Sequence, residues 1–140
     1  MTGLTHMAGG ALAGAAMSGD YRIAVAALAA LMPDWFQVNV PGGSSLTRGV
    51  FGHRGISHWL ITAIGVAALV AIVSPGLSVY VLAGWVSHIV LDVLSNGAPA
   101  LWPLPRITLA RIKSGSFLDA IVGSALLSLF FAILLVRLLR

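Results

Sequence analysis

Three long apolar stretches constrain the fold of this chain more than any other feature. They cover residues 57–74, 77–94 and 117–136. Each supplies the roughly 18 to 20 residues that an α-helix needs to cross about 30 Å of hydrocarbon. Only 9% of the residues are charged and 59% are hydrophobic, whereas about a quarter are charged in soluble domains. We therefore predict an all-α, polytopic membrane helical bundle with three clear spans.

The N-terminal region carries two shorter apolar runs, residues 7–17 and 23–33. Each run is about half to two-thirds of a span, so it predicts either a short helical pair packed against the other helices or two tilted spans. Gly10 and Gly14 have the GxxxG spacing that lets one helix approach another closely. Further on, the Ser74-Pro75-Gly76 break is expected to join the first two long spans as an antiparallel hairpin.

We expect the whole chain, residues 1–140, to form a single membrane-embedded metal-dependent hydrolase-like domain. The segment AGAAMSG resembles the small-residue site at which signal peptides are cleaved. A secretory signal also needs a basic segment before its apolar run, and the first Arg or Lys is Arg22. We therefore expect the first helix to be retained, and His6 with it.

Nearly all of the histidines and aspartates are expected at one membrane face. The chain has four His and four Asp, with no Glu and no Cys. If residues 7–33 form a hairpin, the N-terminus and the loops 34–56 and 95–116 emerge on the same side. That side then holds seven of these eight residues: His6, Asp34, His53, His58, His88, Asp92 and Asp119.

Their spacing predicts a shared metal site. His88 and Asp92 are four residues apart and share a helix face, so together they can bind one ion or supply a ligand and the group that orients it. His53 and His58 flank a glycine-containing bend at a helix entrance. Taken singly, a buried His can be a packing residue and an interfacial Asp a helix cap. Ionisable side chains at membrane depth are costly, however, so seven of them together indicate a functional site.

The donor set limits the metal and the chemistry. Four imidazoles and three carboxylates without a thiolate favour Zn(II), with Mn(II) or Fe(II) as alternatives. They are too many for one tetrahedral ion, so we expect either two ions or one ion with an elaborate set of supporting residues. Such a centre lowers the pKa of bound water to near 7, which makes hydrolysis the natural reaction class.

The motifs THMAGGALAGA, LMPDWFQ, GHRGISH and GWVSHIVLDVLSNGAPALWPLP resemble the YdjM-like family of inner-membrane proteins. Members are described as predicted metal-dependent hydrolases and as LexA-binding. The resemblance runs from about residue 5 to 120. It implies metal ligation by the early His, the Pro-Asp, the HRG, the next His and the SHxxxD, which here are His6, Asp34, His53, His58, His88 and Asp92.

This chain departs from the family pattern at two places. Where the family commonly has Asp-Ile-Asp after the proline, it has Asp34-Trp35-Phe36, which removes one potential ligand. A late acidic residue is often Glu in the family, and here the candidate is Asp119, as ligand or general base. The order of His and Asp also resembles, more weakly, that of zinc-dependent phospholipase C enzymes.

The expected substrate is a phosphoester, lipid-linked or accessible at the membrane surface. Guanidinium groups bind phosphate oxygens well, so Arg54 is a candidate phosphate clamp; a salt bridge to Asp34 or Asp92 is the structural alternative. Membrane lipids are the other expected partners, and no nucleic acid is expected. The membrane side with the long loops is expected to carry five cations, Arg48, Arg54, Arg106, Arg111 and Lys113, against Arg22, Arg137 and Arg140 on the opposite side. This difference favours a cytoplasmic site in the inner membrane.

Two alternatives come from other functional classes. A metal or proton transporter would use the same ligands, but it should carry polar residues deep in the bilayer and on both faces, where this chain offers only Asp20. A noncatalytic membrane adaptor would fit the basic loops, yet it gives no reason for the clustered histidines.

Overall fold

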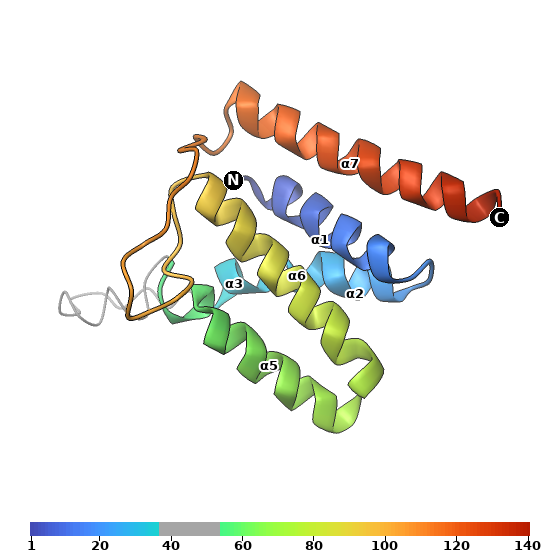
Figure 1. Cartoon of the computed structure of the whole chain (residues 1–140), viewed down its shortest axis with the longest axis horizontal. Coiled ribbons are helices and arrows are strands. Elements are labelled where there is room, and N and C mark those ends of the chain that lie inside the picture. Colours follow the sequence, from blue (N-terminus) through green and yellow to red (C-terminus); the bar gives the residue numbers. More distant parts are fainter. Residues whose placement is uncertain (37–53) are drawn as a thin grey trace.

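The computed structural model describes residues 1–36 and 54–140, and these residues fold as a helical bundle (Figure 1). Within these ranges there is no β-strand, only an isolated bridge between Ala98 and Ile107. The all-α fold class is therefore confirmed. The helices are α1 (Gly3–Met17), α2 (Arg22–Ala29), α3 (Met32–Trp35), the 3-10 helix η1 (Ile56–His58), α5 (Leu60–Val73), α6 (Pro75–Leu94) and α7 (Phe117–Leu138).

Helices α1 and α2 form the predicted N-terminal pair. The Thr2 side chain caps α1 by accepting a hydrogen bond from the Thr5 N–H. The two glycines of the GxxxG motif face α2: a Cβ on Gly10 would lie 2.5 Å from the Ala26 carbonyl oxygen, and one on Gly14 would lie 3.0 Å from the Ala26 Cβ. Close helix contact at this motif is thus confirmed.

The predicted helix over residues 23–33 is divided in two. Helix α2 ends at Ala29, and the short helix α3 begins at Met32 with Pro33 in its first turn. Proline has no N–H to donate and its ring clashes with the preceding turn, so it cannot continue a helix but can begin one. The break turns Asp34 toward the interior of the bundle.

Helix α6 is the centre of the bundle and packs against α1, α2 and α5 (Figure 1). Its buried side chains include Val81, Trp85 and Ile89, which form a core with Ala29 of α2 and Ala63 of α5. Gly84 lies against the backbone of Ala26, where a Cβ would overlap the carbonyl oxygen. Ala26, which is fully buried, is therefore enclosed by glycines of α1 and α6.

Two helices of the described ranges, not three, are long and apolar enough to cross a membrane: α6 with 20 residues and α7 with 22. The prediction of a third full span over residues 57–74 is wrong. Residues 56–58 form a 3-10 turn and Trp59 is extended, so α5 has only 14 residues, or about 21 Å at 1.5 Å per residue. The hairpin between α5 and α6 at Ser74 is confirmed.

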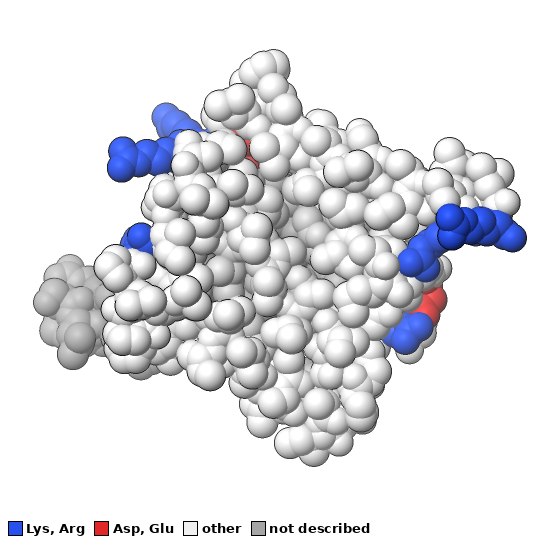
Figure 2. Space-filling model, in the orientation of Figure 1, with Lys and Arg blue, Asp and Glu red and all other residues white. Residues whose placement is uncertain are grey.

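Helix α7 lies on the outside of the bundle, beside α1 (Figure 1). It buries only Asp119 and Gly123. Basic side chains gather at two opposite ends of the molecule, and the surface between them is uncharged on the face that Figure 2 shows. This distribution suits a molecule that crosses a bilayer with both ends in the headgroup layers.

Replacing Gly84 with Ala should destabilise the bundle, because the new methyl group would overlap the Ala26 backbone. We expect the free energy of unfolding to fall by about 2 to 3 kcal/mol, measured by denaturant titration in detergent micelles. Gly76→Ala is the matched control on the same helix, where a Cβ meets nothing within 4 Å. It should leave stability unchanged or raise it by up to about 1 kcal/mol. Equal effects of the two changes would contradict this packing.

Candidate metal centre

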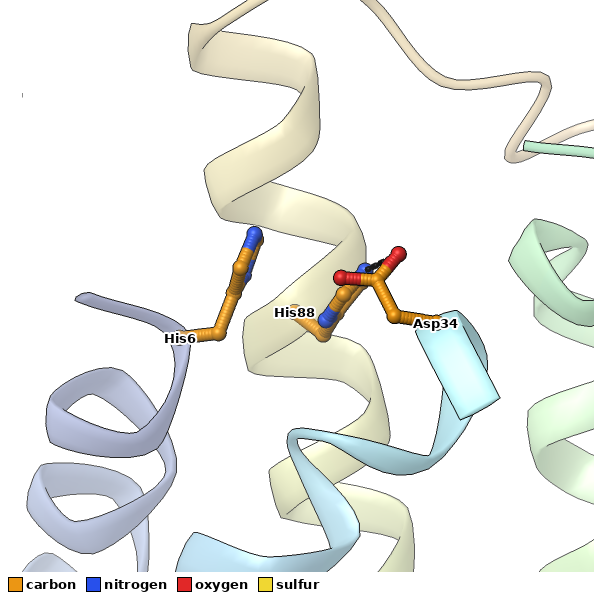
Figure 3. A group of neighbouring side chains, drawn as sticks. All are labelled: His6, Asp34 and His88. Carbon is orange, nitrogen blue, oxygen red and sulfur yellow. Dashed lines mark ion pairs between the residues drawn. The ribbon is translucent and has the colours of Figure 1, made fainter. Parts of the chain in front are cut away.

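Five of the predicted site residues converge near the end of α6. His88 and Asp92 lie on α6 itself, and His6, Asp34 and His58 reach them from α1, α3 and η1. Figure 3 shows the imidazoles of His6 and His88 and the carboxylate of Asp34 approaching one another from three helices. Segments up to 86 positions apart in the sequence, from residue 6 to residue 92, therefore supply one cluster.

The distances within the cluster are those of groups that can surround one ion. His58 Nε2 lies 3.1 Å from His88 Nε2 and 3.2 Å from Asp92 Oδ2. The Oδ1 atom of Asp34 lies 3.6 Å from His58 Nε2 and 3.7 Å from His88 Nε2. Ligands held at about 2.0–2.1 Å around a tetrahedral zinc ion are separated from one another by roughly 3.3 Å. The spacing therefore fits a metal centre.

Backbone and side-chain contacts fix the orientation of two of the imidazoles. His88 Nδ1 lies 2.7 Å from the carbonyl oxygen of Ala30, just beyond the end of α2. A carbonyl can only accept, so Nδ1 donates and Nε2 of the neutral ring is left with its lone pair toward the cluster. His58 Nδ1 lies 3.0 Å from Ser57 Oγ, and the Trp85 indole donates to the Ser57 carbonyl at 2.8 Å. These contacts tie η1 to α6.

His88 belongs to two overlapping triads. One donor atom from each of His58, His88 and Asp92 lies within 4.8 Å of the others, and the same holds for His6, Asp34 and His88. Because Nδ1 of His88 is bonded to Ala30, only its Nε2 can bind a metal, and one lone pair holds one ion. The two triads are therefore parts of one centre and do not define two independent ions.

His6 is held against this centre by stacking. Its ring lies 3.8 Å from that of His88, nearly parallel to it at 18°, and its Nε2 lies 3.5 Å from Asp92 Oδ1. The side chain is only 1% exposed. Its Nδ1 is buried without a hydrogen-bond partner among the described residues, which is uncommon and costly for a polar atom in a protein interior. The cluster thus contains a ring nitrogen, His6 Nδ1, that is not occupied by a hydrogen bond to the described residues.

Among the described members of the cluster, Asp34 is the most accessible to solvent. His6, His58, His88 and Asp92 are each at most 1% exposed, whereas the side chain of Asp34 is 35% exposed. Burial raises the pKa of Asp34, but the hydrogen bond from His58 and the neighbouring imidazoles outweigh this and hold that pKa below its ordinary value. Burial lowers the pKa of His58, yet the carboxylates of Asp34 and Asp92 raise it overall.

Arg54 is buried beside Asp92 and faces inward. Its guanidinium donates to Asp92 Oδ1 at 2.9 Å, to the Gly97 carbonyl at 3.0 Å and to Ser95 Oγ at 3.3 Å, and the residue is 5% exposed. The structure thus favours the salt bridge to Asp92 over the phosphate clamp, because a guanidinium enclosed in this way is not presented to a ligand. Its backbone is left-handed, with φ of 59°, a costly conformation for arginine.

Asp119 does not join the cluster. Its Oδ1 accepts from the Thr5 hydroxyl at 2.7 Å, and its Oδ2 accepts from the backbone N–H groups of Thr2 and Gly115 at 2.9 and 2.8 Å. The carboxylate therefore ties the first turn of α7 to the N-terminus of α1. With these acceptor positions filled, the role of ligand or general base does not fit its surroundings, and its place is that of a structural anchor.

His53 lies outside the described residues, so its part in the site stays a prediction. Sequence reasoning did not identify the groups that orient the imidazoles. Ser57 stands directly before His58, which is a usable signal for a supporting hydroxyl. The Ala30 carbonyl gives no such signal, because any residue at the end of α2 would present the same backbone oxygen.

Comparison with known proteins yields a family match. The model of the family described as YdjM inner membrane protein matches residues 1–139. No curated protein matches the chain, and no solved structure does.

Replacing Arg54 with Gln should weaken metal binding without removing a ligand. The guanidinium holds Asp92 by one oxygen and leaves Oδ2 facing His58 and His88, and loss of such a supporting contact costs roughly 10- to 100-fold in metal affinity. Competition with a chelator of known affinity would measure the change. Arg106→Gln, which removes an exposed cation of the 95–116 loop, should leave the affinity unchanged. Equal affinities for wild type and Arg54→Gln would contradict the assigned role.

Replacing Asp119 with Ala should lower stability but keep the metal content of the wild type. The change leaves three donors without their acceptor, which should cost about 3 kcal/mol of unfolding free energy. Thr5→Val removes one of these hydrogen bonds and should cost about 1 kcal/mol. Detergent unfolding and elemental analysis on the same samples separate the two properties. Loss of metal from folded Asp119→Ala would restore Asp119 as a ligand.

Proposed function

Since the chain belongs to the YdjM inner membrane protein family, we propose that it is an integral membrane metalloenzyme that hydrolyses a phosphoester at the membrane surface. The observation that carries this proposal is the buried cluster of His58, His88 and Asp92, with Asp34 and His6 beside it. Three imidazoles and two carboxylates without thiolate suit a divalent ion, zinc first and manganese or iron next.

The depth of the cluster supports chemistry at the headgroup layer. Asp92 and His88 lie two and six residues before the end of α6 at Leu94, which is about 3 and 9 Å along the helix axis at 1.5 Å per residue. If α6 spans the bilayer, its last turns reach the boundary between acyl chains and headgroups. A phosphoester carried on a lipid presents its phosphate at this depth.

The supporting residues suit hydrolysis. A divalent ion held here would lower the pKa of bound water to near 7 and make hydroxide available as a nucleophile. The protein's part is to hold the ligands in place: Arg54 fixes Asp92, the Ala30 carbonyl fixes His88, and Ser57 fixes His58. Asp34, whose side chain is 35% exposed, marks the side of the cluster from which substrate would enter.

The residues below the cluster argue against a transport path. One turn further into α6 lies Gly84, packed on the backbone of Ala26, and next to it is Trp85, which is 1% exposed. A permeation route would need polar groups or space at these positions. Asp20, at the other end of the bundle, is paired with Arg22. We place the cluster on the cytoplasmic side, because the loops at its end carry more Arg and Lys than the opposite end.

The test is metal content together with phosphoesterase activity. Purified protein should contain stoichiometric zinc, manganese or iron by elemental analysis and should cleave an aryl phosphodiester. His58→Ala and His88→Ala should each reduce bound metal and activity at least tenfold, because each removes a buried ligand. Asp20→Asn, an Asp at the far end of the bundle, is the matched control and should change neither property.

The outcomes test the centre itself and separate an enzyme from a transporter. If His58→Ala and His88→Ala left the metal content unchanged, the centre would be wrong. Stoichiometric metal without hydrolysis of any phosphoester would contradict the proposed enzymatic activity but leave the metal centre standing. Metal flux into proteoliposomes that depends on His88 would favour a transporter instead.

A further inference from the structure

The loop between α6 and α7 presents large apolar side chains and cations together on one surface. We call this the 101–113 surface. Its exposed apolar residues are Leu101, Trp102, Leu104, Ile107 and Leu109, and its exposed cations are Arg106, Arg111 and Lys113. We propose that the 101–113 surface lies in the headgroup layer and binds anionic phospholipids. This inference does not depend on the metal centre or on the proposed reaction.

Backbone bonds hold the loop in place, so its exposed side chains cannot simply turn inward. Ala98 and Ile107 exchange two hydrogen bonds of 3.1 Å. The N–H groups of Leu109 and Ile112 donate to the carbonyls of Val93 and Leu94, at 2.9 and 3.2 Å, in the last turn of α6. The loop is thereby folded back over the end of the central helix.

Two stacked tryptophans fix the other edge of the loop. The rings of Trp59 and Trp102 lie 4.3 Å apart and nearly parallel, and the Leu60 N–H donates to the Ala100 carbonyl at 2.9 Å. Trp102 is still 56% exposed in this position. Tryptophan is enriched where one part of the ring meets hydrocarbon and the other meets headgroups. The stack therefore belongs at the interface of a bilayer.

The charge of the loop favours anionic lipid. No acidic residue occurs between Ser95 and Leu118, whereas three cations do. Leu, Ile and Trp side chains beside Arg and Lys are typical of segments that lie in the membrane interface, where the apolar groups enter the acyl boundary and the cations meet phosphate. The loop covers the C-terminal end of α6, where Arg54 contacts Asp92 and Gly97.

The experiment compares two variants that each lose two positive charges. Arg106→Gln with Lys113→Gln alters the 101–113 surface, and Arg137→Gln with Arg140→Gln alters the far end of α7. Each protein is reconstituted in phosphatidylcholine vesicles with chain-labelled phosphatidylglycerol or phosphatidylcholine, and electron spin resonance gives the relative association constant of the two lipids. Circular dichroism serves as the folding control: both variants should keep the helix content of the wild type.

We expect the preference for phosphatidylglycerol to fall about fivefold or more in the loop variant, since one Arg or Lys near an anionic surface contributes roughly a fivefold factor. The far-end variant should change it less than about twofold, because Arg137 donates to the Ala16 carbonyl and packs on Gly19, whose neighbour Asp20 brings negative charge to that end. Raised salt should reduce the wild-type preference. Equal losses in both variants, or no loss in either, would overturn the proposal.

A second measurement tests contact with the bilayer directly. The difference in fluorescence between wild type and Trp102→Phe isolates the emission of Trp102, and phospholipids brominated near the headgroup should quench that emission. Emission that these lipids do not quench would overturn membrane contact. If the wild type is instead a dimer that the loop variant dissociates, with no dependence on lipid, the surface binds a second copy of the chain and the proposal is likewise wrong.

Discussion

The carboxylate of Asp92 is the group around which one end of the bundle is organised. It is 1% exposed, and Arg54, His58 and His6 approach it from three different segments. A buried carboxylate without compensation would cost several kcal/mol, so the fold is stable only when these partners are in place. The left-handed backbone of Arg54 costs conformational free energy, which these contacts offset. The same contacts leave Oδ2 of Asp92 directed at His58 and His88.

Small residues allow the imidazoles to meet. Gly10 and Gly14 bring α1 onto α2, and Gly84 brings α6 onto the same stretch of α2 around Ala26. In a membrane, where apolar side chains gain little by leaving lipid, such close backbone contact is a main source of helix association. The approach of α2 also places the Ala30 carbonyl within reach of His88. Packing at the middle of the bundle thus sets the geometry at its end.

Local periodicity predicted much of this correctly. The helical pair at the N-terminus, the α5–α6 hairpin and the shared face of His88 and Asp92 all follow from spacing along one or two helices. Three features could not be predicted in this way. The length of α5 depends on where the 3-10 turn ends. For Arg54 the sequence left Asp34 and Asp92 as possible partners, and only the fold selects Asp92, 38 positions away. The role of Asp119 depends on two threonines 114 or more positions away. Single-sequence patterns carry no record of such long-range pairing.

The wide separation of the ligands along the chain has a consequence for biosynthesis. His6 and Asp34 are synthesised before His88 and Asp92. The His6 imidazole and the Asp34 carboxylate therefore lack their partners on α6 until that helix has been made and has docked. Because α6 contacts α1, α2 and α5, its arrival completes the core and the cluster in one step. An ion could therefore meet the full ligand set of the proposed centre only after α6 has docked.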